Sequence, residues 1–172
     1  SPSLQTAGSD CWTTVQHRVY CYRNWTQYQS EFGELGPDEN YWIGLNPFSR
    51  SLRRANRKLR ILMKAWNESE SWAEYSSFSV GAESDNYRLQ VLGSDGIGDS
   101  LSYSSGSQFS TKDADHDDSS SSCAERYAGG WWFRGCYSTH PNGVYKNFTD
   151  AIGGPFGHVI IWKYRYGFYY SR

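Results

Sequence analysis

The middle of the chain alternates apolar and polar residues with a period of two. In "RKLRILMKAW" (residues 57–66), Leu59, Ile61 and Met63 fall on one face of an extended chain, and the opposite face carries Arg60, Leu62 and Lys64. This period predicts a half-buried strand. The next two apolar stretches, "SWAEYSSFSV" and "NYRLQVLG", continue the alternation. We therefore expect the three segments to pair as an antiparallel meander.

The flanking segments follow other patterns. "WTQYQSEF" (residues 25–32) spaces its rings at helical intervals and is followed by Gly33, which predicts a short helix. "NYWIGL" (residues 40–45) predicts another short helix or a buried turn, and "HVIIWKYRYGFYYS" (residues 158–171) predicts a strand. Past Gly93 the composition shifts to Ser, Gly and Asp. Such a long irregular region needs a device to hold it, usually a disulfide or a metal ion.

Composition and charge fit one soluble, loop-rich domain. The chain has 172 residues, 17% aromatic residues with 8 Trp, and a net charge of −1, which points to no particular partner. No apolar run approaches the length of about 18 residues that a membrane helix needs. The first ten residues have neither a basic start nor an apolar stretch, so any signal peptide is expected to have been removed or to lie outside this sequence.

Cysteines and glycosylation motifs point to the secretory pathway. The four cysteines form an even set that allows three connectivities, of which two local pairs are the simplest. No zinc-type Cys/His spacing accompanies them. Three acceptor motifs occur, at Asn24, Asn67 and Asn147. Paired cysteines together with three such motifs predict a secreted, extracellular glycoprotein.

The stretch "STKDADHDDSSSSC" (residues 110–123) gathers several carboxylates in a turn-rich loop. Taken alone, it is a solvated acidic loop or a cation site. Calcium prefers six to eight oxygen ligands, drawn from carboxylates, carbonyls and water. The loop lacks the Gly and Glu positions of an EF-hand.

The surroundings of this loop carry a family resemblance. An "FST" followed by spaced Asp residues, a cysteine, Gly130-Trp131-Trp132, a second cysteine and "NGVY" occur in this order. "YWIGL" and "GDSLSY" precede them. The run resembles the fibrinogen-related domain, the C-terminal fibrinogen fold of ficolins and tachylectins, over nearly the whole chain. The resemblance implies an α+β fold with a central antiparallel sheet, short helices and a long loop-rich calcium-binding C-terminal region.

The resemblance also implies ligands for one Ca²⁺ ion. The side chains of Asp115 and Asp117 and the backbone carbonyls of Ser119 and Ser121 match the family's calcium ligands. Asp113 then supports this set from outside it, and Asp118 is a reserve candidate for a ligand. A Cys123–Cys136 disulfide would hold the far end of the loop. The ion is expected to stabilise the loop and not to take part in chemistry.

A recognition site follows from the same resemblance. In the lectins of the family, a cis peptide before the second cysteine presents N–H groups to an acetyl oxygen, and here that bond is Gly135–Cys136. The family's aromatic funnel matches Tyr127, Tyr137, Phe156, Gly157 and Phe168. Tyr137 stands where most ligand-binding relatives have His. The implied function is lectin-type binding of acetylated or capped glycans, within a larger homo- or hetero-oligomer.

The ends depart from the family. Residues 1–172 are predicted to form a single fibrinogen-like domain, without the family's first subdomain and closing strand. Cys21 stands where relatives have a short turn, so a Cys11–Cys21 bridge is expected to be local to this chain.

Two rival functions have different support in the sequence. No GxSxG, HExxH or P-loop motif occurs, and the histidines at positions 17, 116, 140 and 158 are scattered, as expected for surface or loop residues. We therefore predict no enzyme. The alternative is a structural or protein-interaction module of an extracellular assembly. The basic run at residues 50–60 could then bind an anionic glycan or an acidic partner, although it also fits a solvated loop before a strand.

Overall fold

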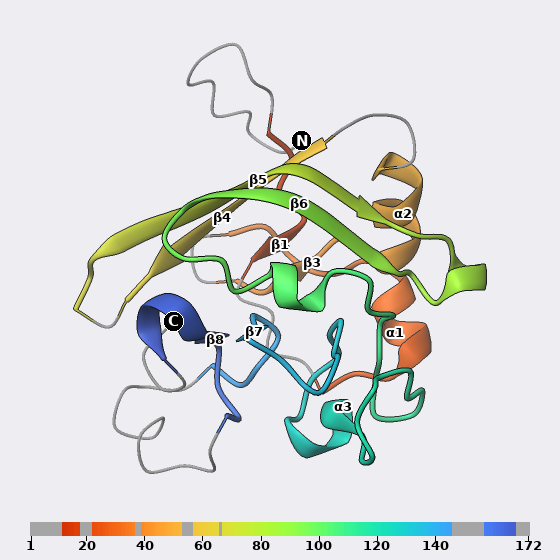
Figure 1. The fold of residues 1–172 in the computed structure, drawn as a ribbon. Coiled ribbons are helices and arrows are strands. Elements are labelled where there is room, and N and C mark those ends of the chain that lie inside the picture. Colours follow the sequence, from red (N-terminus) through yellow and green to blue (C-terminus); the bar gives the residue numbers. More distant parts are fainter. Residues whose placement is uncertain are drawn as a thin grey trace.

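The main sheet is the antiparallel meander β4-β5-β6, formed by β4 (Arg57–Lys64), β5 (Glu70–Val80) and β6 (Leu89–Gly96). It arches over the rest of the molecule (Figure 1). The three predicted strands and their order are confirmed. In this computed structural model the described residues are 12–17, 22–36, 39–52, 57–65, 67–145 and 157–167.

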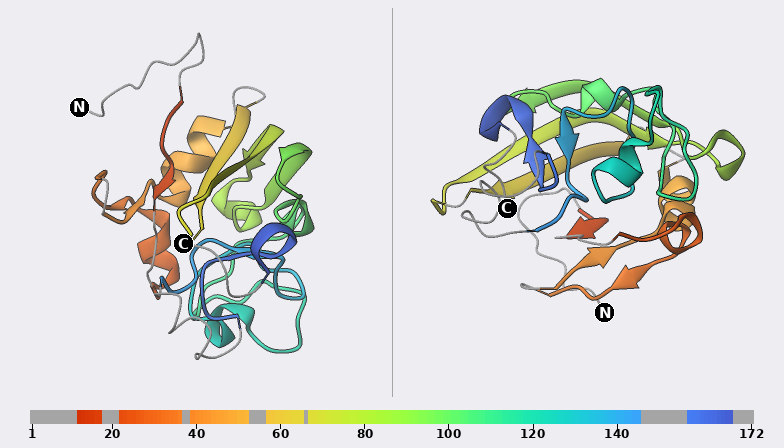
Figure 2. Two further views of the ribbon diagram at one scale, coloured as in Figure 1. Left: turned by 90° about the vertical axis from the view of Figure 1, so that its left-hand side faces the viewer. Right: turned by 90° about the horizontal axis from the view of Figure 1, so that it is seen from below.

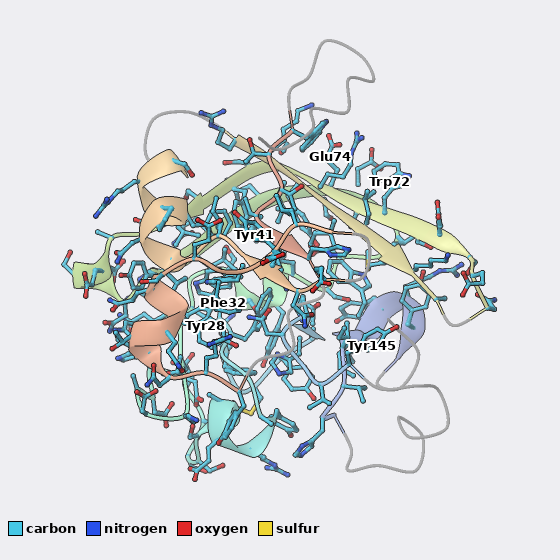
Figure 3. All side chains as sticks on the ribbon, turned by 180° about the vertical axis from the view of Figure 1, so that it is seen from behind. Tyr28, Phe32, Tyr41, Trp72, Glu74 and Tyr145 are labelled. Carbon is cyan, nitrogen blue, oxygen red and sulfur yellow. A yellow bond between two sulfur atoms is a disulfide. The ribbon has the colours of Figure 1, made fainter. Side chains whose placement is uncertain are left out.

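The register of the sheet explains which side chains point into the core. Leu62 lies opposite Trp72, and both are exposed on the outer face, Leu62 by 77%. Ala73 and Tyr75, on alternate positions of β5, are buried. Because side chains alternate between the two faces of a strand, the period of two in the sequence corresponds to one covered and one exposed face. Figure 3 shows Trp72 on the outer side, away from Tyr28.

Two short helices border the sheet. In α1 (Trp25–Gln29), Asn24 accepts a hydrogen bond from the Gln27 backbone N–H, and the Gln27 side chain accepts one from the Asn24 N–H. This reciprocal pair is a capping box, which fixes the start of the helix. The helix α2 (Leu45–Leu52) tolerates Pro47 because the first-turn N–H groups lack intrahelical partners.

Two expectations about the N-terminal half are corrected. The first helix ends at Gln29, before the predicted end, because Phe32–Gly33 forms strand β2. "NYWIGL" is neither a helix nor a turn at its start: Tyr41–Trp42 is strand β3, which pairs with β2 and with β1 (Gln16–His17). A strand of two residues is too short to show a periodicity in the sequence. Its strand conformation depends instead on pairing with segments elsewhere in the chain.

The C-terminal segment was predicted to be a strand, and this is only partly correct. Strand β8 is limited to Ile161–Trp162, which pairs with β7 (Thr139–His140). The next residues form helix α5 (Lys163–Tyr166). Figure 2 shows these elements below the main sheet. No helix in the described ranges is both long and apolar enough to cross a bilayer.

An aromatic cluster joins the sheet to the irregular region that follows it. Phe109 is fully buried, and its ring centroid lies 5.0 Å from that of Trp132 and 5.2 Å from that of Tyr28. The indole of Trp132 donates to the Tyr87 carbonyl at 2.7 Å. Trp131, Trp132 and Trp162 are buried, as expected for core rings. Edge-on aromatic pairs of this kind contribute about 0.5–1.5 kcal/mol beyond area burial.

Candidate functional site

The acidic loop is anchored to α1 by Asp113. Its Oδ1 accepts hydrogen bonds from the Trp25 backbone N–H at 2.9 Å and from the Thr111 hydroxyl at 2.8 Å. A bridge between Thr111 and Ala114 tightens the turn around it. The Asp113 carboxylate therefore holds the loop against α1, and this role is separate from that of the predicted calcium ligands.

Asp115 and Asp117 lie together, with Asp117 at the centre of the loop. Asp117 donates its backbone N–H to Asp115 Oδ1 at 3.2 Å. Its own carboxylate accepts from the N–H of Ser119 at 2.8 Å and of Cys123 at 2.9 Å. Burial, and then the neighbouring Asp115 carboxylate, raise the pKa of Asp117, while these two N–H bonds lower it.

The donors of this loop fit one kind of metal. Among the described residues, no three His, Cys, Asp or Glu side chains cluster as a metal site. Two carboxylates with backbone carbonyls are instead an all-oxygen set, which suits calcium and not zinc. The unfavourable proximity of Asp115 and Asp117 is what a bound cation would relieve.

The segment after the loop is held from two sides. Cys123 and Cys136 form a disulfide across a sequence separation of 13 residues. Helix α3 (Cys123–Arg126) begins at this bridge, and Ser122 accepts from the Glu125 N–H at its start. The Asp118 N–H donates to the Arg134 carbonyl at 3.0 Å. The acidic loop, the disulfide and the segment around Arg134 thus form one connected frame.

The Gly135–Cys136 peptide bond is cis, at the position that the family resemblance indicates. The N–H of Arg134 donates to the Cys136 carbonyl at 2.8 Å, which closes a tight turn around the bond. Gly135 is exposed and Cys136 is partly exposed. Backbone atoms of this turn are therefore accessible to a ligand.

Tyr127, Tyr137 and Gly157 lie together beside this turn. The rings of Tyr127 and Tyr137 meet edge-on with centroids 4.8 Å apart. The Tyr137 hydroxyl donates to the Gly157 carbonyl at 2.5 Å. Gly157 has φ +76, and a Cβ there would lie 2.1 Å from that hydroxyl, so both its backbone and its neighbour require glycine. Phe156 and Phe168, predicted for the same funnel, lie outside the described residues.

His140 was predicted to lie on the surface or in a loop, and this is wrong. The residue is fully buried in β7. Its ring stacks on Tyr137 with centroids 5.3 Å apart, and its Nε2 lies 3.3 Å from the Tyr127 carbonyl, which requires a proton on Nε2. Burial lowers the pKa of His140 to about 3, so the ring is neutral at physiological pH. His140 therefore packs as an uncharged ring against the Tyr137 ring and the Tyr127 carbonyl.

The remaining predicted residues are placed as follows. Asn24 is the cap of α1, and the exposed Asn67 accepts from the Ser69 N–H and hydroxyl. Asn147, Cys11 and Cys21 lie outside the described residues. Within the basic run, Lys58 and Arg60 both contact Glu74, which reduces the free positive charge of this face.

The fold and this frame define a fibrinogen-like globular domain. The family "Fibrinogen beta and gamma chains, C-terminal globular domain" matches residues 3–172, so the protein belongs to it. Mouse angiopoietin-related protein 6 is 40% identical over 139 residues, which cover 78% of this chain and 30% of that protein. Ryncolin-4 of Cerberus rynchops is 36% identical over 167 residues, covering 93% and 47%. The chain spans less than half the length of either relative.

Solved structures agree with this assignment. The fibrinogen-like globe domain of human ANGPTL6 superposes with a TM-score of 0.81 at 32% identity, covering 91% of this chain and 71% of that one. A lamprey fibrin D-dimer, complexed with the peptide ligand Gly-His-Arg-Pro-amide, gives a TM-score of 0.85 at 28% identity, covering 98% and 60%. The predicted family and fold class are thereby confirmed.

Proposed function

We propose that this chain is a secreted, non-catalytic recognition domain, stabilised by calcium, that binds acetylated or otherwise capped glycans at the Gly135–Cys136 turn. The observation that carries the proposal is the exposed cis turn beside the Tyr127–Tyr137 pair, within a frame of disulfide and acidic loop. Such a frame holds binding groups in place before the ligand arrives, which lowers the entropic cost of binding.

Calcium would be held by the side chains of Asp115 and Asp117 and the carbonyls of Ser119 and Ser121. Its charge would offset the repulsion of the two carboxylates and fix the loop. Because Asp117 also accepts from the Cys123 N–H, the ion would stabilise the start of α3 and the disulfide beside it. Its contribution to recognition is therefore positional.

The ligand's acetyl oxygen would accept from the N–H groups of the Gly135–Cys136 turn, and its methyl would contact aromatic carbon. Tyr137 contributes its ring and not its hydroxyl, because the hydroxyl is bonded to Gly157. Phe156 and Phe168 would complete the apolar wall. Aromatic rings suit this task because they bury a methyl with little side-chain entropy to lose.

A titration tests this proposal. We expect N-acetylglucosamine to bind in calcium and to bind more weakly in chelator, whereas glucose and unacetylated glucosamine do not bind. Tyr137→His should strengthen binding, since an imidazole would not reach Gly157 as the phenol does. Equal binding of acetylated and unacetylated sugars would refute acetyl recognition, and binding independent of calcium would refute the role of the loop.

A second candidate is a protein-interaction module of an extracellular oligomer. The specific observation in its favour is the Tyr137–Gly157 hydrogen bond, which joins the two sides of the predicted funnel. The angiopoietin-related protein among the relatives is compatible with it. In this case no sugar binds, and the basic face at Lys58 and Arg60 is the surface to test. Retention on heparin that is lost at modest salt would support contacts there, and Arg60→Gln should reduce it.

A further inference from the structure

A polar cavity of about 210 Å³ is lined by Arg134 and by residues of the acidic loop. Its walls come from four parts of the chain: Arg88 before β6, residues 105–108 after η2 (Ser102–Ser104), the acidic loop through His116 and Asp118, and Arg134. Figure 1 shows that η2 and α3, which border two of these segments, both lie below the main sheet. None of these residues belongs to the predicted acetyl site or to the calcium ligands.

Arg88 is fixed in the wall as a preorganised donor. Its Nη1 donates to the Gly106 carbonyl at 2.6 Å, and its Nε and Nη2 donate to the Asp85 carboxylate at 3.0 Å. This contact with Arg88 lowers the pKa of Asp85, so the carboxylate stays charged and the guanidinium stays in place. A guanidinium carries five N–H donors, so Arg88 keeps some for a ligand.

Arg134 is the less committed cation. Its Nε lies 3.8 Å from Asp118 Oδ2, beyond hydrogen-bond distance, and both side chains are more than half exposed. Its guanidinium makes no hydrogen bond to another side chain within the described part of the chain. A planar fork with unused N–H groups matches a carboxylate with two parallel hydrogen bonds.

The rest of the wall is polar and neutral. The Ser105 hydroxyl is bonded to the Val91 backbone, so the Gln108 amide, whose Nε2 makes only a long contact of 3.5 Å with Asp85, is the neutral side-chain group that can turn to a ligand. A Cβ built at Gly106 would meet no atom within 4 Å, so the wall is open there. The Nδ1 of His116 lies 2.7 Å from the Phe109 carbonyl and donates to it, so Nε2 is the ring atom left for a ligand hydroxyl. Phe133 is fully buried, so the cavity offers little apolar surface.

We propose that this cavity binds one acidic monosaccharide unit of the uronic acid type. Its carboxylate would pair with Arg134, displacing Asp118, and would lie near the remaining N–H groups of Arg88. Its ring hydroxyls would exchange hydrogen bonds with the neutral wall. The volume lies below the range of about 300–1,000 Å³ typical of drug-sized ligands, so a single sugar ring is the right size. The site is independent of acetyl recognition.

The test is a calcium-containing NMR titration of the whole chain with glucuronate and with glucose, which differ at the carboxylate. Glucuronate should bind and glucose should bind at least tenfold more weakly, since hydrogen bonds between charged groups are the strong ones. Arg134→Gln should lose roughly tenfold or more in glucuronate affinity. Asp118→Asn should gain up to about fivefold, because it removes a competing carboxylate from an exposed pair.

Controls separate binding at this site from general attraction of anions to surface arginines. The variant Arg165→Gln, which changes an exposed arginine in α5, should bind glucuronate like the unmodified chain. Thermal melts should show that Arg134→Gln is folded.

The site would be overturned if glucose bound as tightly as glucuronate, or if Arg134→Gln bound glucuronate as tightly as the unmodified chain. Acetate binding as tightly as glucuronate would overturn the sugar recognition and leave an anion site. Binding of a Glu-containing peptide but not of glucuronate would overturn the saccharide assignment.

Discussion

The main sheet and the region after Gly98 are stabilised in different ways. Strands β4–β6 are stabilised by long ladders of backbone hydrogen bonds and by the burial of one face of the sheet. The other face is exposed and carries Leu62 and Leu92. The part of the later region that the structure describes has only short elements, such as η2, α3 and β7, and depends on hydrogen bonds made by side chains. Asp99, for example, accepts from the Ser102 N–H and from the Tyr75 hydroxyl.

This difference is a physical reason for placing both proposed recognition surfaces in the later region. A ladder fixes its backbone groups to each other, whereas a loop held by side chains leaves peptide groups accessible, as at Gly135. In such a loop, each side-chain hydrogen bond holds a particular stretch of backbone, and no neighbouring bond replaces it when it is lost. Stability in the two regions should therefore respond to different substitutions.

The largest effect is expected where the two regions meet, at Phe109. Its ring contacts rings from α1, β3 and the segment that contains Trp132. Phe109→Ala should cost about 3–5 kcal/mol in the free energy of unfolding, since a large buried side chain leaves a cavity. Denaturant titration measures this. Leu92→Ala, exposed on the sheet, should change it by less than about 0.5 kcal/mol; similar losses would show that Phe109 is not a junction.

The disulfide should matter next, and mainly for the later region. Replacing both Cys123 and Cys136 by Ala removes a constraint of about 3 kcal/mol in the chain-entropy model for a loop of this length. Hydrogen exchange should speed up in residues 110–136 more than in β5. Uniform acceleration across both regions would instead mean that they unfold as one unit.

Calcium should separate the roles of two aspartates in the same loop. Asp117→Asn should lower the melting temperature more in calcium, by the equivalent of up to about 2.7 kcal/mol at 100 times Kd, than in chelator. In chelator the loss is limited to one of the two backbone N–H bonds, from Ser119 or Cys123, that the carboxylate accepts. Asp113→Ala should lower it in both conditions, because it removes hydrogen bonds to Trp25 and Thr111 that need no ion. Equal losses for Asp117→Asn with and without calcium would exclude it as a ligand.

The sequence predicts the secondary structure of the main sheet better than that of the short elements elsewhere. Alternation identifies β4, β5 and β6 because each strand is long enough to repeat its period. The two-residue strand at Tyr41–Trp42 has no period, and the prediction there was wrong. The placement of the acidic loop and the cis turn came from ordered motifs of the family and not from periodicity.

Some of the site was beyond prediction from the sequence for a physical reason. His140 is polar, and only the fold shows that Tyr137 and Phe133 stack around it. The cavity at Arg134 likewise combines segments far apart along the sequence, so no local motif marks it.

The smallest expected effect lies on the outer face of the sheet, at Glu74 (Figure 3). Hydrogen bonds from Arg60, helped by Lys58, lower the pKa of Glu74 below its usual value. A carboxyl whose pKa is lower in the folded state stabilises the fold above its unfolded pKa, and this contribution is lost as the pH falls through the folded pKa. Because solvent screens the pair, Glu74→Gln should cost less than about 1 kcal/mol at pH 7.

The cost of Glu74→Gln should then shrink toward zero on acidification below about pH 4, while high salt should reduce it at neutral pH. Denaturant titrations of the variant and of Glu70→Gln, on the same strand, measure the difference at each pH. A cost that persists in acid would assign Glu74 a packing role instead of a charge role. In that case the outer face of the sheet would depend on specific contacts between side chains in the same way as the later region.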